Sequence, residues 1–130
     1  MPRWRCIISA KPILIIEDHT EIRSMLEEFF LSEGYHVLIA GHGQEALDLL
    51  DQKSTPRPGL ILTDFSMPVM NGPEFLLELE RKHPKIFAQT PIFVMSAGSD
   101  TRKLAVKITG FVKKPFDLNE LSIISAKYRL

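Results

Sequence analysis

Short runs of consecutive apolar residues alternate along this chain with longer segments in which apolar residues recur every three or four positions. The short runs are typical of β-strands buried on both faces, and the longer segments are typical of helices with one buried face. The predicted strands are residues 12–17, 35–40, 60–64, 91–96 and 111–112. The predicted helices run from Thr20 to Gly34, over 44–53, from Asn71 to before Pro84, weakly over 101–108, and from Asp117 to Tyr128.

Polar residues at the starts of three helices are suited to cap them. Thr20 and Asp117 can each accept a hydrogen bond from a backbone N–H of the first helical turn. Asn71 followed by Glu74 predicts a capping box, with Asn in the position usually taken by Ser or Thr. Gly34 is a typical residue for the end of the first helix.

The alternation of strand and helix, repeated five times, predicts an α/β domain. Its strands should form a parallel sheet covered by helices on both faces and joined by right-handed crossovers. Residues 11–130 fit one such domain, and residues 1–10 are expected to be a loosely ordered leader. Ligands of such sheets bind beyond the carboxyl ends of the strands.

Carboxylates stand at those ends in two of the predicted strands. Residues 60–64 end in Asp64, and the apolar run 12–16 is followed by Glu17 and Asp18. A charge is costly inside a core, so these groups should face water, a metal or a phosphoryl group. Two buried strands that bring three carboxylates to one sheet edge indicate a divalent cation and chemistry at an aspartate.

Composition narrows the choice of partners. The 130 residues contain 16 acidic and 16 basic side chains, so no net charge favours nucleic acid or an anionic membrane surface. The single cysteine, Cys6, cannot form an intrachain disulfide, which fits a reducing cytoplasm. No apolar run approaches the roughly 18 residues of a membrane span. We therefore expect a cytoplasmic protein that does not itself bind DNA or a membrane.

Four short motifs stand at or just past the ends of predicted strands. They are Glu17-Asp18, Asp64 with Met67-Pro68-Val69-Met70-Asn71-Gly72, Ser96-Ala97, and Lys114-Pro115-Phe116. Together they resemble the motifs of the receiver domain of bacterial two-component response regulators, over about residues 11–130, with the single-domain chemotaxis regulator as the simplest relative. The resemblance implies a flavodoxin-like fold with a five-stranded sheet of order 2-1-3-4-5 and five helices.

The resemblance implies that Asp64 accepts a phosphoryl group from the phosphohistidine of a sensor histidine kinase or phosphotransfer protein. Mg²⁺, or Mn²⁺ in its place, would be held by Glu17, Asp18 and Asp64 together with the backbone carbonyl of Ser66. The chain would then be a signalling receiver rather than an enzyme with a separate substrate. An unknown downstream protein would read its state.

Three further residues receive roles from the same resemblance. Lys114 would pair with the phosphoryl oxygens, aimed into the site by a cis Lys114–Pro115 bond. Ser96 would donate a hydrogen bond to one phosphoryl oxygen. Phe111 would turn inward when Ser96 moves, although an aromatic residue in a strand could equally be ordinary core.

General chemistry favours the same roles for these side chains. A carboxylate is a poor nucleophile toward an anionic phosphoryl donor, because the charges repel. Phosphoryl transfer has a loose transition state, so positioning and charge neutralisation supply most of the catalysis. A hard cation and the compact charge of Lys114 would both provide that neutralisation.

The sequence also departs from the family pattern. The stretch from Ser96 to Lys114 is a few residues short, which shortens the fourth helix, expected over 100–108 with Leu104, Ala105 and Ile108 as a thin apolar stripe. The usual partner surface, made by helix four, strand five and helix five, is therefore in question. Phe111 lacks the hydroxyl of a tyrosine, so its switching would depend on packing alone.

Several alternatives stay open at this stage. The chain could be a phosphorelay intermediate or phosphate sink, a receiver kept only as an interaction module, or a fragment of a larger regulator or hybrid kinase. A Mg²⁺-dependent phosphatase with an aspartyl nucleophile is a remote alternative, since it needs an acid where Ser66 stands. The four histidines are expected to be surface residues rather than phosphodonors or metal ligands: His19, His36, His42 and His83.

Overall fold

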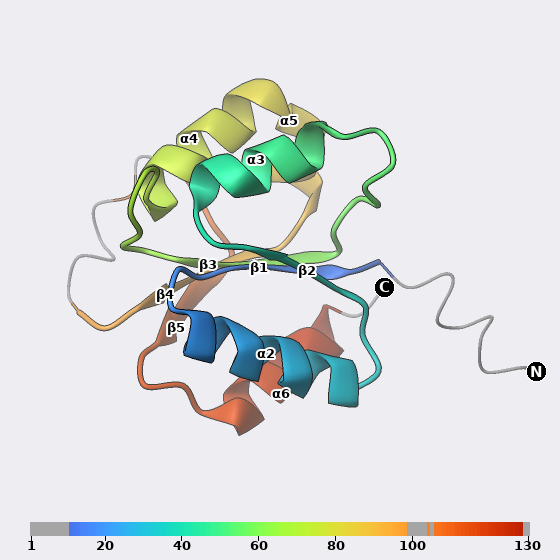
Figure 1. Cartoon of the computed structure of the whole chain (residues 1–130), viewed down its shortest axis with the longest axis vertical. Helices are drawn as coiled ribbons and strands as arrows, with labels where there is room; N and C mark the ends of the chain where they lie inside the picture. The colour runs from blue at the N-terminus through green and yellow to red at the C-terminus, as the bar shows by residue number, and fades with distance from the viewer. Residues whose placement is uncertain (1–10, 99–103, 105, 129–130) are drawn as a thin grey trace, which may run out of the picture.

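The computed structural model describes residues 11–98, 104 and 106–128. Within them, strands and helices alternate along the chain except at two points, where first two helices and then two strands follow one another (Figure 1). The strands are β1 (Ile13–Ile16), β2 (Val37–Ala40), β3 (Leu60–Asp64), β4 (Ile92–Ser96) and β5 (Gly110–Lys113). The helices are α2 (Thr20–Ser32), α3 (Gly43–Asp51), α4 (Gly72–Lys82), α5 (Pro84–Gln89) and α6 (Leu118–Lys127).

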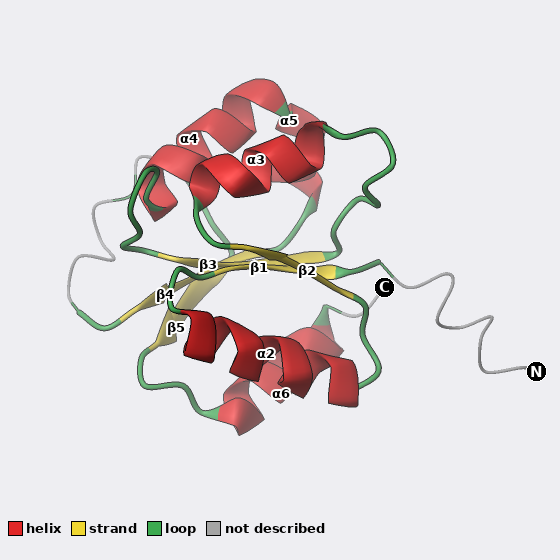
Figure 2. Ribbon diagram, in the orientation of Figure 1, coloured by secondary structure: helices red, strands yellow, loops and turns green. Residues whose placement is uncertain are grey.

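The five strands form one parallel sheet in the order β2-β1-β3-β4-β5, as predicted. Helices α3, α4 and α5 cover one face of the sheet, and α2 and α6 cover the other (Figure 2). The architecture is therefore the flavodoxin-like receiver fold. None of the described helices is long and apolar enough to cross a bilayer.

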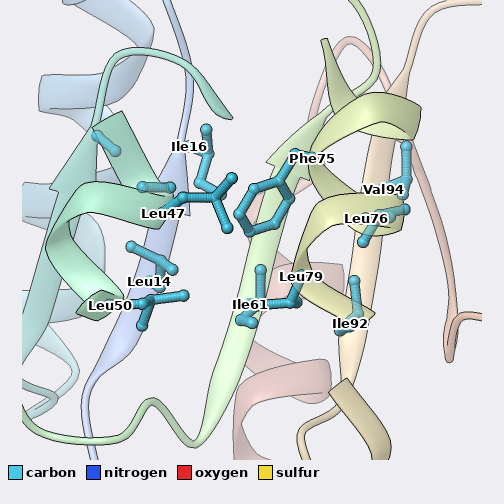
Figure 3. Packing of buried hydrophobic residues seen from close by; sticks show 12 residues of the cluster. Leu14, Ile16, Leu47, Leu50, Ile61, Phe75, Leu76, Leu79, Ile92 and Val94 are labelled. Carbon is cyan, nitrogen blue, oxygen red and sulfur yellow. The ribbon is translucent and has the colours of Figure 1, made fainter. Parts of the chain in front are cut away.

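Successive residues of each central strand point to opposite faces of the sheet, so β1 and β3 supply two separate cores. Leu14 and Ile16 pack under α3 and α4 with Phe75 (Figure 3). Ile13 and Ile15 pack on the other face with Phe30 of α2. A strand buried on both faces can end in a charged residue only at its tip, and this places the carboxylates of β1 and β3 at the sheet edge.

Three of the predicted helix ends are confirmed. Asn71 and Glu74 form a reciprocal capping box at the start of α4. The Asp117 side chain accepts a hydrogen bond from the backbone N–H of Asn119. Gly34 follows α2 with φ of 93°, a conformation that glycine adopts without a steric penalty.

The predicted cap at Thr20 is wrong. Thr20 is the first residue of α2, and its N-cap is His19, whose side chain makes no capping hydrogen bond. Because His19 has an extended backbone and Thr20 is already helical, the Thr20 hydroxyl is one position too late to cap the helix.

Helix α5 is a feature that the sequence analysis did not predict. Pro84 ends α4, as expected, but it also stands in the first turn of α5, where a proline is well tolerated. The shortened helix expected over 100–108 lies largely outside the described residues. Its described positions, Leu104 and residues 106–108, are not helical, so the five helices of the described residues include α5 and not the expected helix.

Gly72 lies where the chain after β3 turns into α4, directly against the backbone of Asp64 and Phe65. Its N–H donates to the carbonyl of Phe65 at 2.9 Å. A Cβ atom at this position would overlap the backbone carbonyl oxygen of Asp64 and lie 3.1 Å from the Cα of Phe65. The glycine therefore allows α4 to begin against the backbone that carries Asp64.

We predict that Gly72→Ala lowers the free energy of unfolding by about 2 kcal/mol, because the backbone of Asp64 and Phe65 must shift. Urea denaturation measures this change. Gly98→Ala is the matched control, since a Cβ there has open space, and it should change the free energy of unfolding by less than about 0.5 kcal/mol. Equal effects of the two substitutions would contradict the close approach at Gly72.

Candidate functional site

The carboxylates of β1 and β3 meet because the two strands are adjacent and in matched register. Ile16 pairs with Thr63, which places Glu17 and Asp64 side by side at the carboxyl end of the sheet. Glu17 is fully buried and Asp64 is only 5% exposed. Two acids buried this closely need a positive charge between them.

Lys114 provides that charge from the segment that follows β5. Its Nζ donates to Glu17 Oε1 at 3.0 Å and to Asp64 Oδ2 at 2.9 Å. The Lys114–Pro115 peptide bond is cis, as expected. The backbone N–H of Lys114 also donates to the carbonyl of Ser96 at 3.0 Å, which fixes the lysine relative to β4. Sequence positions 17, 64 and 114 thus converge on one ion-pair network.

Lys114 contacts both buried acids, but the pKa values of the two carboxyl groups shift in opposite directions. Burial raises the pKa of Asp64, and the negative charge of Glu17 raises it as well, although Lys114 acts in the opposite direction. Burial alone would also raise the pKa of Glu17, but hydrogen bonds from the His19 backbone and from Lys114 hold that pKa below its usual value. For Lys114, burial opposes the charged form, yet the two carboxylates raise its pKa overall. Of these two acids, Asp64 is therefore the one whose charged form is less favoured.

Asp18 is the third acid at this edge, and one of its oxygens has no partner. Its Oδ1 atom is buried and accepts no hydrogen bond within the described part of the chain. Buried carboxylate oxygens are normally hydrogen-bonded or bound to a metal. Single donor atoms of Glu17, Asp18, His19 and Asp64 all lie within 4.8 Å of one another. The donor set and the unpartnered oxygen fit a divalent cation that prefers carboxylate ligands.

A cleft of about 250 Å³ opens in front of Asp64. Ser66, Ser96 and Lys114 line it, so the structure brings these predicted residues together around the Asp64 side chain. Asp64 Oδ1 accepts the N–H of Phe65 at 2.8 Å, and Ser96 Oγ accepts the N–H of Gly98 at 3.2 Å. The cleft can accommodate a small anionic group between a lysine and a serine hydroxyl.

Phe111 lies further from Asp64, on the edge strand β5. Its side chain is 42% exposed, so it is not the ordinary core residue that the sequence also allowed. A second surface hollow, of about 500 Å³, is lined by both Ser96 and Phe111. A movement of Ser96 would therefore change the space next to the Phe111 ring.

His19 is a site residue that the sequence analysis did not select. Its side chain is 66% exposed, in keeping with the expected surface position. Its ring Nδ1 nevertheless lies 3.3 Å from Glu17 Oε2 and 3.6 Å from Asp18 Oδ1. The only signal in the sequence was its position directly after Glu17-Asp18, and that position alone did not determine which way the ring points.

The sequence of this chain is similar to those of known proteins. The sequence profile of the response regulator receiver domain matches residues 13–125. The transcriptional regulatory protein CpxR of Escherichia coli is 35% identical over 113 residues, which cover 84% of this chain and 45% of CpxR. The chain thus spans less than half the length of that relative. Sporulation initiation phosphotransferase F of Bacillus subtilis is 32% identical over 118 residues, covering 89% of this chain and 91% of that protein.

Solved structures agree with the fold. The chemotaxis protein CheY4 of Vibrio cholerae superimposes with a TM-score of 0.81 at 27% identity, covering 92% of this chain and 99% of CheY4. The receiver domain of the sensor histidine kinase PA1611 of Pseudomonas aeruginosa superimposes with a TM-score of 0.79 at 24% identity, covering 92% and 98% of the two chains. That structure contains a magnesium ion coordinated in the active-site cleft.

The profile match spans most of the chain, and it includes the acids, the serine and the lysine that surround the cleft. With the parallel sheet of order 2-1-3-4-5 and the acidic pocket at its carboxyl edge, the chain belongs to the response regulator receiver domain family.

Proposed function

We propose that this chain is a phosphorylation-activated receiver of a two-component system, with Asp64 as the phosphoryl acceptor. The observation that carries the proposal is the double contact of Lys114 with Glu17 and Asp64 at the mouth of the cleft. It places a largely buried cation beside a buried carboxylate whose pKa is raised by burial and by the charge of Glu17. The phosphodonor is a phosphohistidine on a sensor histidine kinase or a phosphotransfer protein, and the reaction takes place in the cytoplasm.

In the transfer, an Asp64 carboxylate oxygen forms a bond to phosphorus while the phosphorus–nitrogen bond of the phosphohistidine breaks. Lys114, already in contact with Asp64 Oδ2, pairs with the phosphoryl oxygens as they enter the cleft. When bound by Glu17, Asp18, Asp64 and the carbonyl of Ser66, Mg²⁺ supplies positive charge that offsets the repulsion between acceptor and donor. Mn²⁺ could take its place.

Phosphorylation also changes the position of Ser96. Its hydroxyl accepts the Gly98 N–H at 3.2 Å and donates to the Gly98 carbonyl at 3.5 Å, a long contact that it can exchange for a hydrogen bond to a phosphoryl oxygen. Moving Ser96 toward Asp64 enlarges the hollow that it shares with Phe111, and the exposed ring turns inward to fill it. The surface around β5 and α6 then differs between the two states, and an unknown downstream protein binds one of them.

A second candidate is a phosphorelay intermediate, which passes the phosphoryl group on instead of signalling through its surface. It is favoured by the similarity to the sporulation phosphotransferase, which extends over most of both chains. The two candidates share the chemistry at Asp64 and differ in whether the β5–α6 surface responds.

We predict that acetyl phosphate and Mg²⁺ add one phosphoryl group to the protein, detected by intact mass, and that hydroxylamine removes it. Asp64→Asn should abolish labelling, because an amide cannot accept the group, and a chelator should also stop it. Asp48→Asn is the control, since Asp48 is exposed on α3 and should be dispensable. Undiminished labelling of Asp64→Asn would refute the assignment of the acceptor.

A second prediction concerns the repulsion among the three acids without metal. Asp18→Asn should raise the free energy of unfolding of the metal-free protein by about 1 kcal/mol, which corresponds to roughly 4 °C in melting temperature. Mg²⁺ should raise the melting temperature of the wild type and have little effect on this variant. Asp48→Asn again serves as control and should behave as wild type. A lower metal-free melting temperature for Asp18→Asn would show that the acids do not repel one another as proposed.

A third prediction separates a switch from a relay. Beryllofluoride, a phosphoryl analogue, should shift the amide resonances of residues 106–116, and Ser96→Ala should suppress those shifts while Asp64 still accepts a phosphoryl group. Ser32→Ala, on the far end of α2, should leave the shifts intact. Wild-type shifts confined to the neighbours of Asp64 would favour the relay.

A further inference from the structure

Two histidines of this chain are N-cap residues of helices, but only one of them makes a capping hydrogen bond through its side chain. His19 is the N-cap of α2, and His42 is the N-cap of α3. The His42 Nδ1 accepts the backbone N–H of Glu45 at 3.2 Å, as a capping side chain should. The His19 side chain makes no capping hydrogen bond. Its imidazole is therefore oriented by something other than the helix that it precedes.

The ring of His19 is directed at the acids instead. Nδ1 lies 3.6 Å from Asp18 Oδ1, the buried oxygen that has no hydrogen-bond partner among the described residues. It also lies 3.3 Å from Glu17 Oε2, which accepts the backbone N–H of His19 at 3.1 Å. The contacts with Glu17 Oε2 thus hold the His19 ring at the edge of the acidic cluster, and most of the imidazole is exposed to water.

These separations are close to those of two donor atoms that share one metal ion. With metal–ligand bonds of about 2.1 Å, neighbouring donors lie roughly 3.0 Å apart in octahedral geometry and roughly 3.4 Å apart in tetrahedral geometry. The observed 3.3 Å falls between these two values, and the observed 3.6 Å needs only a small contraction. One donor atom from each of Glu17, Asp18, His19 and Asp64 already falls within a 4.8 Å span.

We propose that His19 is a nitrogen ligand of the metal site, so that this receiver binds first-row transition metals such as Co²⁺ and Zn²⁺ with an affinity that its carboxylates alone would not give. Imidazole is a good ligand for these ions, whereas Mg²⁺ strongly prefers oxygen. The side chain of His19 thus sets the metal preference of the site. The proposal rests on the metal site of the proposed function, and it adds a ligand and a selectivity to it.

The experiment compares matched substitutions at the two N-caps. His19→Asn and His42→Asn both introduce a residue that caps helices well, so both variants should fold. Because all oxygen and nitrogen sites favour transition metals over Mg²⁺ to some degree, the informative quantity is the change in the ratio of dissociation constants. Calorimetric titrations with Co²⁺ and with Mg²⁺ give this ratio, with Cys6→Ser in every sample to remove a competing thiol.

We expect His19→Asn to weaken Co²⁺ binding by about tenfold or more and Mg²⁺ binding by less than about threefold. His42→Asn should leave both affinities unchanged. A spectroscopic readout is independent of affinity: on adding one equivalent of Zn²⁺ to protein with ¹⁵N-labelled histidine, the Nδ1 resonance of His19 should shift and that of His42 should not.

Failure of this inference can be distinguished from failure of the proposed function. If Mg²⁺ and Co²⁺ bind to the wild type, are lost in Asp18→Asn, and bind His19→Asn with an unchanged ratio, the metal site stands and His19 is not a ligand. If neither ion binds the wild type, or if Asp18→Asn does not affect binding, the metal site itself is wrong, and the inference falls with it.

Discussion

The site depends on one lysine that holds two buried carboxylates together. Glu17 and Asp64 arrive on separate strands, and Asp18 stands beside them, so negative charge exceeds positive charge at this edge of the sheet. Lys114 is the cation that contacts both buried acids among the described residues. It stabilises the cluster without neutralising it. In the proposed function these incompletely compensated carboxylates bind a cation, and their mutual repulsion lowers the stability of the metal-free protein.

The sheet topology allows these charges to be held close together. Strands β1 and β3 are central and buried on both faces, so their hydrophobic packing on α2, α3 and α4 fixes the positions of the acids at their tips. Gly72 and the capping box at Asn71 hold the start of α4 against the backbone of Asp64. The carboxylates are thus placed by rigid elements. Ser66 and Lys114 approach them from the segments that follow β3 and β5, and Ser96 approaches from the last position of β4.

Much of this could be predicted from the sequence because the signals were local or motif-based. Continuous apolar runs indicated the strands, and Asn71 with Glu74 indicated the start of α4. The failures came where one local signal allowed two structures. Pro84 marked the end of a helix and equally suited the first turn of α5, and both are present. Thr20 was a suitable capping residue, but the helix begins one position earlier than a Thr20 cap requires. The direction of the His19 ring depends on three-dimensional contacts with Glu17 and Asp18, which no spacing rule encodes.

The strand that carries Phe111 has a neighbour on one side only. β5 pairs with β4 and forms an edge of the sheet, whereas the strands that carry the acids are paired on both sides. An edge strand has fewer backbone hydrogen bonds to break, and local opening there requires less free energy than opening of a central strand. In the proposed function, phosphoryl transfer takes place at the tips of central strands, and the rearrangement takes place at an edge strand, which can change conformation without loosening the core.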